Sequence, residues 1–120
     1  MKITLPWLHP KLSPNARTHW AVRSKLVKEA RYVAEVMTLS VMESWERDVY
    51  RFSQRIPVTI TFNPPDKRHR DKQNMPASYS TKAYLDGIAD AIGVDDNLFH
   101  PTFAYGEIVK GGAVVVEVSI

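Results

Sequence analysis

Two stretches of this chain have apolar residues at every second position, which is the pattern of a β-strand with one buried face. In the first, from Pro57 to Phe62, the apolar side chains share one side and Pro64-Pro65 ends the pattern. The second is the C-terminal stretch, where the residues on one face are Val114, Val116, Val118 and Ile120. Because neighbouring side chains of a strand point to opposite faces, each stretch predicts an apolar face that another layer must cover.

Two longer stretches show the helical period instead. From about Thr18 to Tyr50 no Gly or Pro intervenes, and apolar residues recur at steps of three or four: Leu26, Ala30, Val33, Met37 and Val41. This stretch is long for one helix, so a break is expected near Thr38–Ser44. A second helix is expected from about Ser78 to Ile92, with Gly93 as its C-cap and a buried stripe of Leu85, Ile88 and Ile92.

Two further short strands, together with the two already described, complete the expected order β-α-β-α-β-β. Ile3 and Leu5 alternate with polar residues before Pro6, and two strands are expected at about 103–110 and 113–120. Gly111-Gly112 between the last two predicts a hairpin turn. At 120 residues, the chain is expected to form a single α/β (α+β) domain covering residues 1–120, with helices packed against a small mixed sheet.

The composition narrows the class of protein. The chain has no cysteine, so disulfides and thiolate metal sites are excluded and a reducing cytoplasm is the expected compartment. No apolar run approaches the roughly 20 residues of a membrane-spanning helix, and the N-terminal segment is too short and interrupted for a signal peptide. The net charge of +3 is too mild to establish nucleic-acid binding, but the cations gather around residues 67–72.

The residues that suggest chemistry form a basic run that also contains acids, from Asp66 to Asn74. Lysine and arginine attract a polyanion, whereas carboxylates repel one unless they hold a divalent cation. Asp71 follows the end of a strand, and Asp95-Asp96 follows the next helix, so we expect these acids to meet at strand ends. Mg²⁺ accepts one or two carboxylates together with water and substrate phosphate. The pattern therefore predicts a nuclease.

Each of these residues also has a purely structural interpretation. Asp71 could be a charge partner on a solvated loop, and Asp95-Asp96 could form a polar turn. Lys82 could simply pair with Asp86 one helical turn later, or it could hold the scissile phosphate and stabilise its developing charge. The tryptophans are expected in the core or in an interface rather than against bases; they are Trp7, Trp20 and Trp45.

In their order and spacing these pieces resemble the RusA family of Holliday-junction resolvases, small endodeoxyribonucleases common in phages and prophages. The resemblance covers nearly the whole chain and is most specific at Ile92-Gly93-Val94-Asp95-Asp96. Its other parts are the Leu5-Pro6 strand, the loop from Ser13 to Trp20, the Arg70–Asn74 segment, the helix from Lys82 to Ala91, and the closing Glu107–Gly111 region.

The resemblance implies a homodimer that binds four-way DNA junctions in the cytoplasm of a bacterial host and makes paired, symmetric nicks with Mg²⁺ or Mn²⁺. It implies that Asp71, Asp96 and Lys82 are catalytic, and that Asp71, Asp96, Asp95 and the Gln73 amide oxygen hold the metal. The residues expected to bind DNA belong to the basic run, with one arginine before the first helix: Lys67, Arg68, His69, Arg70, Lys72, Asn74 and Arg17.

One position departs from the family pattern. The family usually has Asp-x-Asp-Asn where this chain has Asp71-Lys72-Gln73-Asn74, and a glutamine brings no negative charge to a cation. Other acids could compensate: Asp66, Asp86, Asp90 or Asp95. Two alternatives therefore stay open, namely a junction-binding protein of the same fold that does not cleave, and an interaction protein whose charged run is only a solvated loop.

Overall fold

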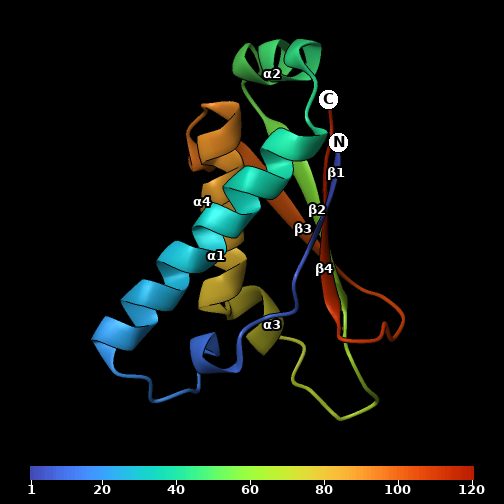
Figure 1. Cartoon of the computed structure of the whole chain (residues 1–120). Coiled ribbons are helices and arrows are strands. Elements are labelled where there is room, and N and C mark those ends of the chain that lie inside the picture. The colour runs from blue at the N-terminus through green and yellow to red at the C-terminus, as the bar shows by residue number, and fades with distance from the viewer.

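The computed structural model describes all residues from 1 to 120 and contains one four-stranded mixed sheet (Figure 1). Across the sheet the strand order is β1-β4-β2-β3. The bounds are Lys2–Leu5 for β1, Ile56–Asn63 for β2, Phe99–Tyr105 for β3 and Ala113–Val118 for β4. β4 lies antiparallel to both β1 and β2, while β2 and β3 are parallel. The expected α+β class with a mixed sheet is confirmed.

Helices cover one face of this sheet, and α1 and α4 cross each other on that side (Figure 1). The helices are α1 (Trp20–Val41), α2 (Ser44–Arg51), the short α3 (Asn74–Ala77) and α4 (Tyr79–Ile92), with 3₁₀ helices η1 (Pro10–Leu12) and η2 (Asp96–Leu98). The expected break in the first helical stretch is confirmed. Glu43 starts α2 with a capping box, because its backbone N–H donates to Glu46 Oε1 at 3.0 Å.

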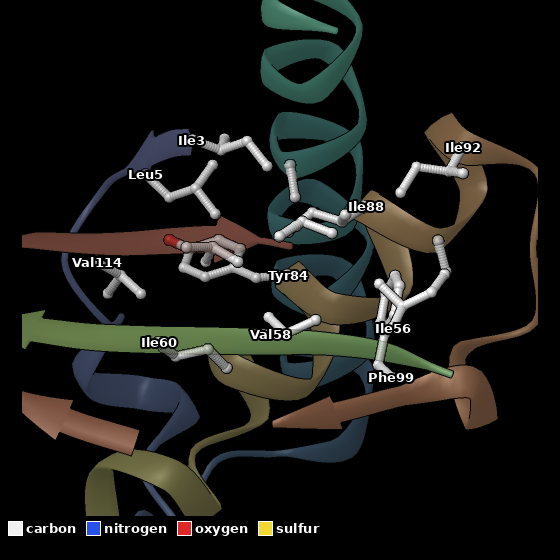
Figure 2. Packing of buried hydrophobic residues seen from close by; sticks show 14 of the residues in the cluster. Ile3, Leu5, Ile56, Val58, Ile60, Tyr84, Ile88, Ile92, Phe99 and Val114 are labelled. Atoms are coloured by element: carbon white, nitrogen blue, oxygen red, sulfur yellow. The ribbon is translucent and has the colours of Figure 1, made fainter. Parts of the chain in front are cut away.

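The alternating residues of the strands form the core, as expected (Figure 2). Ile56, Val58, Ile60 and Phe62 are all buried, and so are the three valines of β4 that share their face. Ile120 is the exception to the predicted face. It lies beyond the end of β4 and is exposed, because no helix or strand extends far enough to cover it.

The contact between α1 and α4 is made by small residues. A Cβ on Gly87 of α4 would collide with the carbonyl oxygen of Arg31 and would lie 2.8 Å from Ala34 Cβ. The buried residues of α1 are accordingly Ala34 and Thr38, whereas Met37 and Val41 of the predicted stripe are exposed. The predicted stripe was therefore correct only in its first part: Leu26, Ala30 and Val33 are partly buried.

The predicted hairpin between the last two strands is wrong. Gly111 and Gly112 do form a tight turn with positive φ, but the residues before it, 106–110, form a loop. β3 ends at Tyr105 and pairs with β2 in parallel, connected through α3 and α4, while β4 inserts between β1 and β2. Parallel pairing places the rings of Phe103 and Tyr105 beside Phe62, with centroids 6.1 and 5.9 Å away.

This topology decides where the candidate acids lie. Asp71 precedes α3 and α4, whereas Asp96 follows α4 and stands before β3. A helix of the length of α4 spans about 20 Å, so the two acids are attached to opposite ends of it. Asp71 thus follows β2 and Asp96 follows α4 and precedes β3, in the order that the sequence predicted.

Candidate functional site

Lys82 joins two carboxylates on the exposed side of α4. Its Nζ lies 3.5 Å from Asp86 Oδ1 and 3.5 Å from Asp96 Oδ2. Lys82 and Asp86 are one helical turn apart, and Asp96 comes from η2, which folds back beside the helix. The structure thus brings together two of the three predicted catalytic residues. It adds Asp86, which the sequence had suggested only as a partner for Lys82 or a substitute acid.

Asp86 and Asp96 lie close enough to share a proton. Partial burial raises the pKa of Asp86, and its hydrogen bond with Asp96 raises it further, against the opposing effect of Lys82. The same hydrogen bond lowers the pKa of Asp96, so the two carboxyl groups titrate as a pair. The pKa of Lys82 is raised by the charges of Asp86 and Asp96, which keeps the ammonium charged. Two carboxylates sharing a proton form a place where a cation can replace that proton.

Two neighbouring acids already have structural partners. Asp90 accepts two hydrogen bonds from the Arg31 guanidinium, at 2.5 and 2.8 Å, and this contact lowers the pKa of Asp90. Asp95 caps η2, since its Oδ1 accepts from the backbone N–H of Asn97 at 3.0 Å. A cleft of about 210 Å³ is lined by these acids together with Asp86 and Asp96. The predicted ligand Asp95 is therefore at the site, with one oxygen engaged.

The basic run forms an exposed loop between β2 and α3 that is held in place by its own side chains. Arg70 donates to Asp66 Oδ1 at 2.8 Å and to the backbone oxygens of Asp66 and Arg68 at 3.1 and 3.0 Å. The backbone N–H of Arg68 and the Arg70 guanidinium both donate to the Asp66 carboxylate and lower its pKa. The Arg70 guanidinium also lies 5.7 Å from the ring centre of Trp7. Arg70, predicted to bind DNA, is thus mostly buried and occupied inside the loop.

A second contact joins the loop to the sheet. Tyr105 Oη donates to the backbone oxygen of Lys72 at 2.8 Å, and Lys72 Nζ lies 5.2 Å from the ring centre of Tyr105. Lys67, Arg68 and His69 are exposed, and their side chains form no hydrogen bond, ion pair or cation–π contact. Arg17 is also exposed, in the separate loop before α1. The loop therefore presents a row of cations on a fixed backbone.

The structure does not bring Asp71 or Gln73 to the carboxylates beside Lys82. Asp71 Oδ1 accepts from the backbone N–H of Gln73 at 2.9 Å, and both residues are exposed. Asp71 lines a different pocket from Asp96, and no three or more histidine, aspartate or glutamate side chains are grouped to hold a metal ion. The predicted ligand set is consequently divided between two places in this structure.

The pocket beside Asp71 was missed by the sequence reasoning. Its volume is about 450 Å³, and its walls come from the loop before α1 and from the basic loop. Trp7 and His9 line it together with Arg68, His69, Asp71 and Asn74. A tryptophan and a histidine flanking prolines give no spacing signal, so only the folded chain could have revealed them.

The fold and these two places define an α+β protein with a lysine-bridged carboxylate pair on one helix and a cationic loop at one end of the sheet. No family model matches the chain. An uncharacterized protein of Xylella fastidiosa (strain Temecula1) is 43% identical over 119 residues, which cover 98% of this chain and 74% of that protein. The chain belongs to the same family as this Xylella protein. None of its helices is both long and apolar enough to span a membrane.

Proposed function

We propose that this protein is a metal-dependent endonuclease that resolves four-way DNA junctions as a homodimer, as the resemblance to RusA resolvases implies. The observation that carries the proposal is Lys82, whose ammonium stands 3.5 Å from both Asp86 and Asp96. Carboxylates beside a fixed cation are the groups that phosphodiester hydrolysis needs. The cationic loop supplies the other requirement, a grip on phosphates.

The carboxylate pair fits Mg²⁺ or Mn²⁺, because these cations take oxygen ligands and Asp86 and Asp96 already approach each other. Asp96 and Asp86 would hold the cation, with Asp95 beside them. Such a cation, when bound there, would lower the pKa of a water ligand and polarise the phosphoryl oxygens. Lys82 stabilises the negative charge that develops on the phosphate.

DNA binding in this proposal rests on the free cations of the basic loop, Lys67, Arg68 and His69, with Lys72, Asn74 and Arg17 as further contacts. Arg70 has the different task of holding that loop in shape. These side chains do not lie along a helix that could enter a DNA groove and read the base edges. In this proposal the protein therefore distinguishes DNA substrates by their shape. A two-fold dimer suits this substrate, since two equivalent sites can meet two equivalent strands.

Exposed apolar side chains on the first two helices support self-association, and Trp45 and Phe52 of the α2 region are 56% and 89% exposed. Light scattering at several concentrations tests the dimer. The lack of cysteine and the bacterial source of the Xylella relative support a bacterial cytoplasm as the setting. A phage or prophage gene as the origin rests on the resemblance alone.

The test is cleavage of a labelled synthetic four-way junction with Mg²⁺ and, separately, Mn²⁺. Asp96→Asn and Asp86→Asn are expected to abolish symmetric nicking while junction binding persists. Asp48→Asn, an exposed acid of α2 away from the site, is the matched control and should cleave normally. Asp71→Asn separates two ligand sets: loss of cleavage adds Asp71 to the metal site, and retained cleavage limits that site to the acids beside Lys82. Nicking that survives both Asp96→Asn and Asp86→Asn would refute the proposed site.

A second candidate is a junction-binding protein that does not cleave. It is favoured by Gln73, which stands where the resembled family has an acid, and by the separation of Asp71 from Asp96. This candidate predicts that the wild-type protein binds four-way junctions but leaves them intact with either cation. Gln73→Asp would then be the variant to examine for restored cleavage.

A further inference from the structure

We infer that the 450 Å³ pocket between the loop before α1 and the basic loop receives one unpaired nucleotide of the bound DNA. This inference rests on the proposed function and specifies its substrate: DNA whose branch point offers an unstacked base. A pocket of this volume belongs to the size class that holds small ligands, and one nucleotide is a ligand of that class.

The lining matches the two halves of a nucleotide. On one side are Arg68 and His69, whose side chains form no hydrogen bond or ion pair within the protein and can meet a phosphate. On the other is Trp7, which lines the pocket beside the Arg70 guanidinium and carries an aromatic ring of the kind on which bases stack. Asn74 and the second oxygen of Asp71 add hydrogen-bonding groups for a base edge.

Trp7 is held in a fixed position. A Cβ on Gly112, which has φ of +73°, would lie 2.8 Å from both Cβ and Cγ of Trp7, so the Gly111-Gly112 turn packs directly against this residue. The Arg70 guanidinium lies 5.7 Å from the ring centre of Trp7. Because the side chain is already ordered, stacking a base on it costs little additional entropy.

The wall that carries Trp7 is fastened to the first turns of α4. Tyr84 Oη donates to the backbone oxygen of Pro6 at 2.8 Å, and the backbone N–H of His9 donates to Ser80 Oγ at 3.2 Å. Ser78 Oγ donates to the backbone oxygen of Leu12 at 3.3 Å. Both walls of the pocket are therefore fixed before DNA arrives, one by α4 and the other by Arg70.

The position of the pocket also fits a base leaving its stack. The pocket opens beside the free cations of the basic loop, so a strand whose phosphates follow those cations passes its mouth. α3 lies between this pocket and the hollow that contains Asp96: Asn74 and Met75 line the first, and Pro76 lines the second. An inserted nucleotide would thus fix the DNA on one side of α3 while the phosphodiester chemistry takes place on the other.

The experiment compares two DNA duplexes that differ in one base. Both carry a single unpaired nucleotide, and in one of them that nucleotide is abasic, so the phosphates are the same. The wild-type protein should bind the base-containing duplex about tenfold more tightly, the effect of one base–aromatic stack. Trp7→Leu should remove this preference, whereas Trp7→Phe should keep most of it. Trp20→Leu, which removes an exposed tryptophan outside the pocket, is the matched control.

A second measurement needs no variant. A 2-aminopurine placed at the unpaired position should lose fluorescence on binding, because stacking on an indole quenches it. If the wild-type protein bound the two duplexes equally tightly and still bound the four-way junction, the inference that the pocket receives a nucleotide would be overturned. The proposed function would remain. A base preference that survives Trp7→Leu in a folded variant would overturn that inference as well. Failure to bind any of these DNAs would overturn both proposals.

Discussion

Gly87→Ala tests how closely α1 and α4 are packed. The new methyl group would meet the Arg31 carbonyl oxygen and would lie 2.8 Å from Ala34 Cβ. A backbone atom cannot turn aside, so the helices must separate. Overpacking of a tight contact costs up to about 3 kcal/mol. Alanine regains about 1 kcal/mol over glycine in a helix interior.

The expected net loss is therefore about 2 kcal/mol of the free energy of unfolding. For a domain of this size that corresponds to a fall of about 8 °C in melting temperature. Separation of the helices should also weaken the Arg31–Asp90 pair, since its partners come from α1 and α4.

The assay is thermal unfolding followed by circular dichroism, with urea unfolding for the free energy. Ser24→Ala, at an exposed position of α1, is the control and should change stability by no more than about 0.5 kcal/mol. A melting temperature of Gly87→Ala that equals or exceeds the wild-type value would refute the reasoning. Such a result would mean that helix propensity outweighs the contact.

The remaining predictions concern the two functional surfaces. Lys82→Met should lower the rate of junction cleavage by about 10²–10³-fold, the size of a lost charge-stabilising group. Because the Lys82 side chain is 72% exposed, Lys82→Met should change the free energy of unfolding by no more than about 1 kcal/mol. Lys28→Met serves as the control. A loss of cleavage rate below threefold would contradict the proposed role of Lys82 in stabilising charge. Mn²⁺ affinity should increase as pH rises through the raised pKa of Asp86, since the proton competes with the cation, and Asp86→Asn should remove that dependence in titration calorimetry. Arg68→Ala should lessen the salt dependence of DNA binding by about one unit of logarithmic slope. Arg70→Ala should instead remove the contacts that hold the loop and so lower the melting temperature of the protein. If the two variants changed the salt dependence of DNA binding equally, the different tasks assigned to Arg68 and Arg70 would be contradicted.

Local sequence determined the elements of this protein. Alternation in residues 57–62 and 113–118 and the helical period before Gly93 were sufficient, because each depends on neighbours a few positions away. Gly93 is the C-cap as predicted, with φ of +84°. The same local logic placed Lys82 and Asp86 on one side of a helix, one turn apart.

Long-range pairing was decided only by the tertiary structure. The Gly111-Gly112 turn is compatible with a hairpin, but β3 lies parallel to β2, where its aromatic rings pack beside Phe62. Asp96 lies beside Lys82, whereas Asp71 lines a separate pocket on the other side of α3. The tertiary structure also shows that a count of basic residues overestimated the number of side chains that are free to bind DNA. A sequence lists charges, whereas contacts such as Arg70 with Asp66 exist only once the chain has folded.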